Sequence, residues 1–170
     1  MAVPFDFVPV ILTGRDAKNY VAERHEGSQH WLSDATDCYV YDDGTWGGHV
    51  WYWSSTHESN AACFSAMQAS RFPSSDMPRT QDDMQPWEHS EWQVVMNGPA
   101  QYRPDIDTSL WDVKSISNGV YYQHAIGTSS LFFWAIDLDS HRLYHHYESG
   151  GFREAKYIAP TDGANRQITK

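Results

Sequence analysis

With 170 residues and a formal net charge of −10, the chain is long enough for one domain, residues 1–170, that buries a core without disulfides or metal ions. The acidic balance argues against binding to nucleic acid, which requires a basic surface, and against binding to an anionic membrane. Eight Trp, ten Tyr and seven Phe are many for this length, and such side chains favour strands and line cavities.

The chain shows no targeting signal and no cysteine scaffold. Its first residues lack a basic stretch, and Asp6 interrupts their apolar run. No run is long enough to span a bilayer, so we expect a cytoplasmic protein. Cys38 and Cys63 are too few for a disulfide framework and lack zinc-type spacing, and the sequence leaves open whether they are bridged.

Short elements separated by turns are predicted for the first half of the chain. Apolar periodicity and the residues that break it predict strands at residues 5–13 and 91–96 and helices at residues 15–26 and 59–70. Residues 71–90 hold three prolines and many polar side chains, and they predict a long irregular loop.

The first hairpin signal is Asp43-Gly44, which lies between two aromatic runs. A two-residue turn there pairs Cys38 with His49. Because side chains alternate along a strand, His49, Trp51 and Trp53 are then expected on one face and Val50 and Tyr52 on the other.

A second hairpin is predicted at Asn118-Gly119, the strongest turn signal in the chain. It pairs residues 111–117 with residues 120–126. The more apolar face of this hairpin, which we expect to face the core, carries Trp111, Val113, Ser115, Val120, Tyr122, His124 and Ile126.

A third hairpin is predicted at Ser140-His141, where a two-residue turn pairs Leu138 with Leu143. This places Phe132, Trp134, Ile136, His145 and Tyr147 on one face and Tyr144, His146 and Glu148 on the other. A slip of one residue would exchange His145 for His146. A last short strand is expected at residues 152–158.

Seven or so antiparallel strands joined by hairpins, with one or two short helices in the first half, predict a mainly β fold. Such a pattern is typical of a closed β-barrel or a sandwich. A small barrel has room for one small ligand.

The inward side chains of the second and third hairpins suggest acid–base chemistry. We expect His124 or His145 to move a proton, with Tyr122 or Tyr147 steadying a substrate oxygen. The ligand-binding residues expected around them are Trp111, Trp134, Tyr147, His49 and Trp51. Histidines satisfied within an ordinary packed core remain an alternative.

Other chemistries have little support. His49, His124 and His145 could face one cavity, but no HxH or HExxH motif accompanies them, so we expect no metal and no cofactor. The chain has no GxSxG elbow for a nucleophilic serine. Its paired carboxylates, Asp42-Asp43 and Asp82-Asp83, are interpreted as turn formers.

The run from Asn118 to Tyr147 contains a Gly-Val-Tyr strand, then a hydrophobic strand that ends in Asp-Leu, then a polar turn. It resembles the closing hairpins of small calycin-type barrels, such as lipocalin-like proteins and phenolic acid decarboxylase-type enzymes. About 30 of the 170 residues are covered. The lipocalin Gly-x-Trp motif is not found near the N-terminus, and no catalytic residue carries over. The resemblance implies a barrel and a small hydrophobic or aromatic ligand.

The function expected from these features is that of a small-molecule-binding protein acting as a cofactor-independent lyase or isomerase. Its substrate would be small and aromatic or hydrophobic, and His and Tyr side chains would supply the acid–base chemistry. The alternatives are a non-catalytic module that binds a small ligand or a glycan through exposed Trp rings, and a structural or assembly protein. Homo-oligomerisation is left open.

Overall fold

The computed structural model describes residues 9–24, 32–44, 49–69, 78–90, 92–126 and 130–149. Seven strands occur among them, at Val10–Thr13 (β1), Thr36–Asp43 (β2), His49–Thr56 (β3), Gln85–Pro86 (β4), Gly119–Ile126 (β5), Ser130–Asp137 (β6) and Arg142–Ser149 (β7). Their helices are Gly14–Arg24 (α1), Asn60–Ala69 (α2) and Gln93–Asn97 (α3), with 3-10 turns at Gln81–Asp83, Gly98–Gln101 and Val113–Ser115.

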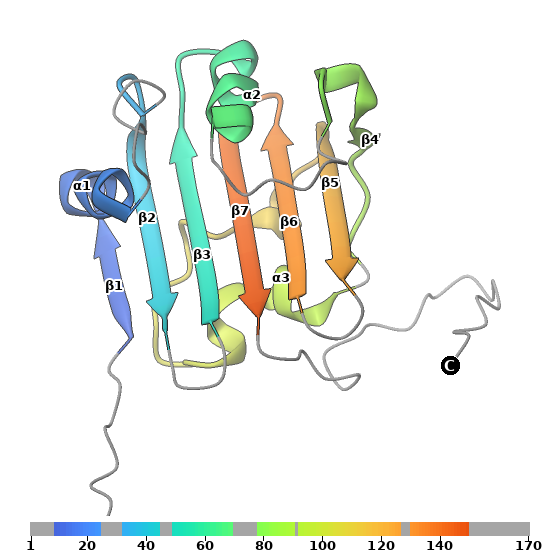
Figure 1. The fold of residues 1–170 in the computed structure, drawn as a ribbon. Helices are drawn as coiled ribbons and strands as arrows, with labels where there is room; N and C mark the ends of the chain where they lie inside the picture. The colour runs from blue at the N-terminus through green and yellow to red at the C-terminus, as the bar shows by residue number, and fades with distance from the viewer. Residues whose placement is uncertain are drawn as a thin grey trace, which may run out of the picture.

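All seven strands belong to one antiparallel sheet of order β1-β2-β3-β7-β6-β5-β4 (Figure 1). The prediction of a mainly β, antiparallel fold with two short helices in the first half is confirmed. Within the described ranges β1 and β4 form the two edges and the sheet is not closed, which leaves the choice between barrel and sandwich undecided.

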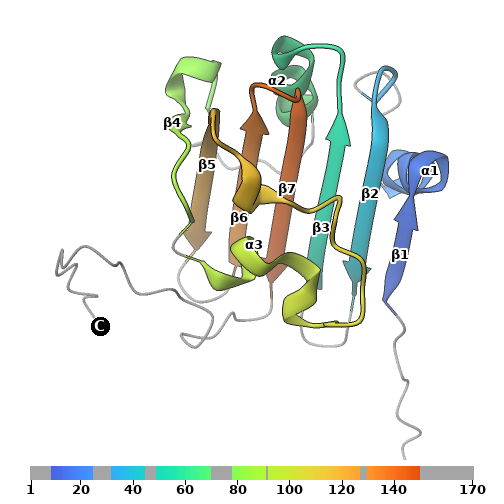
Figure 2. The ribbon, with the colours of Figure 1, turned by 180° about the vertical axis from the view of Figure 1, so that it is seen from behind.

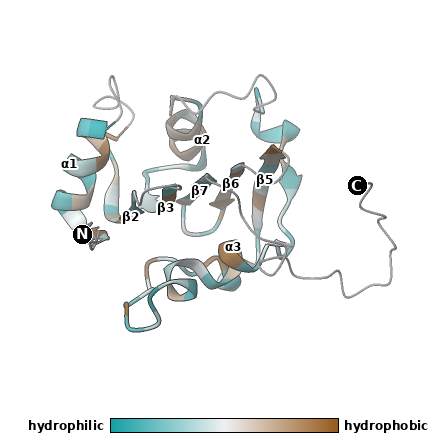
Figure 3. Ribbon diagram, turned by 60° about the horizontal axis from the view of Figure 1, so that its bottom comes forward, coloured by the Kyte–Doolittle hydropathy of each residue, from teal (hydrophilic) through white to brown (hydrophobic). Residues whose placement is uncertain are grey.

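Both faces of the sheet are covered. α1 and α2 lie on one face, which we call the helix face, whereas α3 and residues 98–116 cross the other, which we call the loop face (Figure 1 and Figure 2). Figure 3 shows the same layers from the end of the sheet, with α1 and α2 on one side and α3 on the other. Each described helix is too short or too polar to span a membrane.

Alternation along the strands builds a separate core on each face. The helix-face core combines the buried sheet residues Val40, Trp51, Trp53, Trp134 and Leu143 with Ala17, Val21, Cys63, Ala66 and Met67 of the helices. The loop-face core combines Tyr39, Tyr41, Tyr52, Phe133 and Tyr144 with Val94, Val95, Trp111 and Val113. Strands buried on both faces explain why the sequence is so rich in aromatic side chains.

The two predicted helices of the first half are present. In α1 the buried Ala17 and Val21 are four residues apart and therefore lie on one side of the helix. The start of α2 is stabilised by Ser59, whose Oγ accepts a hydrogen bond from the amide of Ala62 at 3.1 Å. The helices predicted at 15–26 and 59–70 therefore match α1 and α2 to within a few residues, as far as those residues are described.

The strand predicted at residues 91–96 is wrong, because the chain forms α3 there. Val94, Val95 and Met96 are all buried in succession, a pattern that an alternating strand with one covered face does not give. The carbonyl of Trp92 accepts hydrogen bonds from the amides of Val95 and Met96, and Gly98 ends the helix with a φ of 59°.

The hairpin predicted at Asn118-Gly119 is also wrong. Residues 113–115 form a 3-10 turn on the loop face, and β5 begins at Gly119 and pairs with β6 and β4 instead of residues 111–117. A Cβ on Gly119 would lie 2.7 Å from the carbonyl oxygen of Ile136. The glycine is needed for this close approach of two strands, and no tight turn is present.

The third hairpin is present, with a longer turn than predicted. Asp137 pairs with Arg142, so four residues form the connection, and His141 adopts a φ of 53°. The pairing differs from the predicted one by an even number of residues, which preserves the faces. Trp134 and His145 therefore share a face as predicted, and they lie directly opposite each other, whereas the predicted turn pairs Trp134 with Tyr147.

The first hairpin shows the same behaviour. Asp43 pairs with Val50, whereas the predicted turn paired Cys38 with His49, so the predicted register is wrong and the connection is longer. Its alternation is nevertheless confirmed, because Trp51 and Trp53 lie in the helix-face core and Val50 and Tyr52 in the loop-face core. The strand predicted at residues 152–158 and the start of the one at 5–13 lie outside the described residues.

Gly98→Ala is expected to lower the free energy of unfolding by about 3 kcal/mol or more, because Gly98 has a φ of 59° and a ψ of −150°, a region open almost only to glycine. The new Cβ would also lie 2.8 Å from Nε1 of Trp111. Urea denaturation of the purified protein measures the change.

Gly14→Ala is the matched control. Gly14 has the same φ of 59°, but a Cβ there meets no atom within 4 Å. Only the strain of the positive φ remains, and we expect the free energy of unfolding to fall by about 1 kcal/mol. Equal losses in the two variants would show that the packing of Trp111 against Gly98 is not as described.

Candidate functional site

Seven of the eight side chains predicted to form a site share the helix face. Direct pairing across the strands places Tyr122 opposite Trp134, Trp134 opposite His145, and Trp51 opposite Tyr147. His49 and His124 follow on the same face by alternation. Trp111 lies on the loop face, where its ring packs against Tyr52 and Tyr144 at 4.9 and 5.4 Å.

His145 and Trp134 form the floor of the helix face. Their rings stack at 3.7 Å, each residue is only 1% exposed, and Nδ1 of His145 donates a hydrogen bond to the carbonyl of Phe133 at 3.0 Å. A residue so enclosed supports the surface above it and does not itself reach a ligand in this structure.

The structure does not bring His124 and His145 together. His124 lies opposite Phe132 on the outer part of the sheet, half-buried, with its ring parallel to that of Tyr122 at 6.5 Å. His145 lies opposite Trp134, two strands away from His124. The two histidines therefore occupy different environments on one face.

A polar cluster on the part of the helix face farther from β5 joins α1, β2 and β3. Its centre is Asp42, which is 3% exposed. Tyr20 donates a hydrogen bond to Oδ2 of Asp42 at 2.7 Å, and Nε2 of His49 lies 3.1 Å from Oδ1. Arg24 donates to the hydroxyl oxygen of Tyr20 at 2.7 Å and lies 3.9 Å from Oδ2. We call these four residues the Asp42 cluster.

The protonation states of the cluster follow from these contacts. Burial alone would raise the pKa of Asp42, but the hydrogen bonds from His49 and Tyr20 and the charges of His49 and Arg24 outweigh it and lower that pKa. Burial, together with the adjacent carboxylate, raises the pKa of Tyr20 to about 12. At neutral pH Asp42 is therefore ionised and Tyr20 is a protonated donor.

Aromatic rings extend from the Asp42 cluster across the sheet. Tyr20 stacks on Trp51 at 6.2 Å, His49 lies 5.9 Å from Tyr147, and Tyr147 lies 4.8 Å from Phe132. We call these five rings the aromatic row. The side chain of His49 is 35% exposed, so an imidazole held by a buried carboxylate reaches the surface within a row of stacking partners.

Sequence reasoning missed Asp42, Tyr20 and Arg24. Asp42 was interpreted as a turn former, because the turn was predicted directly after it. The signal that could have revealed it is alternation, which places Asp42 on the same face as the buried Cys38 and Val40. Tyr20 and Arg24 are four residues apart on α1, the spacing that lets side chains meet on a helix.

Buried polar groups on the loop face hold the covering segment to the sheet. Arg142, 9% exposed, donates to the side chains of Thr56 and Ser54 and to the carbonyl oxygens of Asp37 and Leu110 at 2.7 to 3.2 Å. Burial lowers the pKa of Arg142. Because these hydrogen bonds hold the segments around Asp37 and Leu110 to the sheet, we assign Arg142 a structural role.

A second buried network on the loop face centres on Glu148. The hydroxyl of Tyr102 donates to Oε2 of Glu148 at 2.9 Å, and Nε2 of His146 lies 3.6 Å from the same oxygen. Nδ1 of His146 donates to the carbonyl of Trp51, and its ring stacks on Tyr52 at 4.2 Å. These contacts join the segment after α3 to β3 and β7.

Two surface depressions lie away from the aromatic row. One of about 400 Å³ is lined by loop-face residues that include Asn97, Trp111 and Lys114. The other, of about 360 Å³, is lined by Ser33, Asp34, Glu58, Ser59, Ala61, Ala62 and Ser65. Of the predicted site residues, Trp111 alone lines one of these two.

No group of three or more His, Cys, Asp and Glu side chains suited to a metal ion occurs in the part of the chain that the structure describes. Cys38 and Cys63 are buried free thiols. Comparison with protein families, curated proteins and solved structures finds no match to the chain.

Asp42→Asn is expected to lower the free energy of unfolding by about 2 kcal/mol at pH 7, because it removes hydrogen bonds to a buried charged group. The folded-state pKa of Asp42 lies below its ordinary value of 3.8. Its stabilisation is therefore present above about pH 4 and is lost as the pH falls through the folded pKa. Urea denaturation at pH 7 and pH 3 should show the difference between wild type and variant shrinking in acid.

The control is Asp105→Asn, which removes an exposed carboxylate paired with Arg103. Its effect at either pH should be small, since exposed ion pairs contribute little. An Asp42→Asn penalty that stays constant or grows in acid would contradict the ionised state assigned to Asp42.

Proposed function

We propose that the protein is a cofactor-independent enzyme of the lyase or isomerase kind that acts on a small aromatic or hydrophobic substrate. His and Tyr side chains on the helix face carry the acid–base chemistry, with His49 as the group that moves the proton. One observation carries the proposal: His49 combines an accessible imidazole with a buried carboxylate that orients it.

The contact with Asp42 defines what His49 can do. The ionised carboxylate of Asp42 lies 3.1 Å from Nε2 of His49, so the neutral ring is favoured with its proton on Nε2, which leaves Nδ1 as a base. Nδ1 of His49 makes no hydrogen bond or ion pair to another residue in the described ranges. When Nδ1 takes a proton from a substrate, the carboxylate stabilises the imidazolium that forms.

The aromatic row supplies the binding surface. A planar substrate stacked beside His49 contacts Tyr147, whose phenol steadies a substrate oxygen, while Trp51, 3% exposed, packs 6.3 Å from the ring of His49. Tyr20 acts as a positioning residue, because its hydroxyl is engaged by Asp42 and Arg24. Trp134 and His145 form the neighbouring cross-strand pair on the same face, and Tyr122 and His124 extend this face toward β4.

A binding module without turnover is the second candidate. The feature that favours it is the aromatic row itself, since stacked rings on a sheet bind flat ligands with or without an acid–base group. The two candidates differ in what His49 contributes. An enzyme loses turnover without it, whereas a binding module loses only a contact.

The test uses 1-indanone, a planar aromatic ketone with exchangeable α-protons, in D₂O near neutral pD. The wild-type protein should accelerate α-proton exchange, followed by proton NMR. His49→Gln should reduce this acceleration at least 100-fold, in the range found for loss of a general base. His89→Gln, which changes an exposed histidine of a loop, should leave the rate unchanged within twofold.

Binding is read separately from the indole N–H signal of Trp51. A shifted signal without accelerated exchange, for 1-indanone and for larger planar ketones, would favour the binding module. No shift with any of them would contradict the proposal. Equal rates for wild type and His49→Gln would remove His49 from the chemistry.

A further inference from the structure

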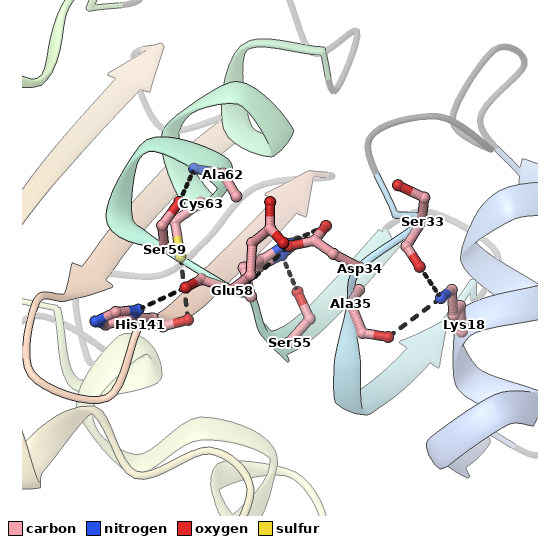
Figure 4. A network of polar contacts seen from close by, with 11 residues as sticks. Lys18, Ser33, Asp34, Ala35, Ser55, Glu58, Ser59, Ala62, Cys63 and His141 are labelled. Atoms are coloured by element: carbon pink, nitrogen blue, oxygen red, sulfur yellow. Dashed lines mark hydrogen bonds and ion pairs between the residues drawn. The ribbon is translucent and has the colours of Figure 1, made fainter.

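A second chain of hydrogen bonds lies at the start of α2, away from the aromatic row. Oγ of Ser55 lies 2.8 Å from Nε2 of His57, and Nδ1 of His57 lies 3.2 Å from Oδ1 of Asp34. The other carboxylate oxygen of Asp34 accepts the amide N–H of Glu58 at 2.9 Å. Figure 4 shows these contacts together with the surrounding network.

The order Ser–His–Asp resembles a nucleophilic triad, but its burial excludes that role here. Ser55 is fully buried and the imidazole of His57 is 0% exposed, so no substrate carbonyl can reach Oγ. The depression of about 360 Å³ touches the opposite end, where Asp34, Glu58 and Ser59 line it. The hydrogen-bonded chain from Ser55 to Asp34 therefore ends in the wall of this depression.

The network joins four parts of the fold. Asp34 belongs to the turn before β2, Ser55 to β3, and Glu58 to the connection that leads into α2. The amide of His57 donates to the carbonyl of His141 in the β6–β7 turn at 2.9 Å, and Sγ of Cys63 donates to the same oxygen at 3.1 Å. Loss of the His57 contacts would therefore leave the turn at residues 32–35 joined to the start of α2 mainly through the bond between Asp34 and the amide of Glu58, and so weaken this connection.

We propose that Ser55, His57 and Asp34 form a proton-sensitive latch that holds one wall of this depression in place and releases it when His57 takes up a second proton. In the neutral ring Nδ1–H donates to Asp34 and Nε2 accepts the hydroxyl of Ser55. A second proton on Nε2 removes the acceptor of the fully buried Ser55 hydroxyl and places a charge on a side chain that is 0% exposed.

The charged and titratable groups around His57 determine the pKa of its ring. Burial lowers the pKa of His57, and the charge of Lys18 acts in the same direction, whereas Asp34 opposes both. Lys18 itself donates to the carbonyls of Ser33 and Ala35. The main chain of Glu58 and the ring of His141 contact each other at 3.3 Å, and burial raises the pKa of Cys63 to about 12, which keeps it neutral.

The latch is expected to weaken as the pH falls. The pKa of His57 in the closed state lies below its ordinary value of 6.5. The latch is therefore fully formed above about pH 6.5 and weakens as the pH falls toward the closed-state pKa, by roughly tenfold in the opening equilibrium per pH unit. The proposal is independent of the function assigned to the aromatic row.

The test is hydrogen exchange of single amides in the full chain, followed by NMR and expressed as protection factors, which divide out the intrinsic effect of pH. The reporters are the amide of Glu58, bound to Asp34, and the amide of Cys63 in the first turn of α2. Their protection should fall between pH 7 and pH 5.5, by up to roughly tenfold, while that of Trp53 within the sheet stays constant.

Two variants assign the effect. His57→Gln keeps a donor and an acceptor but cannot titrate, so its protection factors should not depend on pH in this range. His141→Asn, which tolerates the positive φ of that position, should retain the wild-type dependence. Constant protection in wild type, an unchanged dependence in His57→Gln, or its loss in His141→Asn would each overturn the proposal.

A measurement without substitution keeps the inference testable if His57→Gln does not fold. The ring nitrogens of His57 are titrated by NMR in the wild-type protein. A pKa below 6.5, with the fall in protection lying between pH 6.5 and that pKa, supports the latch, and a pKa at or above 6.5 overturns it.

Discussion

The pairing of β3 with β7 is the constraint on which the rest of the structure depends. Eight residue pairs in continuous register, from His49 with Ser149 to Thr56 with Arg142, join the first half of the chain to its last described strand. Because both strands are buried on both faces, this register decides which aromatic ring meets which cover. It places Trp51 and His145 beneath the helices and Tyr52 and His146 beneath the loop segment.

Burial on both faces brings polar groups into the interior, and the contacts of each group indicate its role. A buried charge is tolerated only where hydrogen bonds and counter-charges replace water. Arg142 binds loop carbonyls, and Glu148 binds Tyr102 and His146, so both contribute to holding the fold. Asp42 differs because one of its partners, His49, is accessible at the surface. A buried carboxylate beside an accessible imidazole is one arrangement suited to acid–base chemistry.

The parts of the fold that sequence predicted correctly are those that depend on alternation alone. Two predicted turns were too short, yet the shifts were even in number, so the face assigned to His145 and Trp51 survived. Predictions failed where apolar residues serve a cover and not the sheet. Val95 and Trp111 are as apolar as strand residues, and only tertiary packing shows that they belong to α3 and to the segment that crosses the loop face. Asp42 was missed because a carboxylate beside a predicted turn is ordinarily solvated.

We propose that Asp42 fixes the tautomer of His49, so that Nδ1 of His49 is the accessible base. Long-range proton–nitrogen NMR of the wild-type protein at neutral pH observes both ring nitrogens of a histidine directly. We expect the neutral ring of His49 to carry its proton on Nε2, beside Asp42, and Asp42→Asn to change this tautomer preference. A ring protonated on Nδ1, or one that exchanges freely between the two tautomers in wild type, would contradict it.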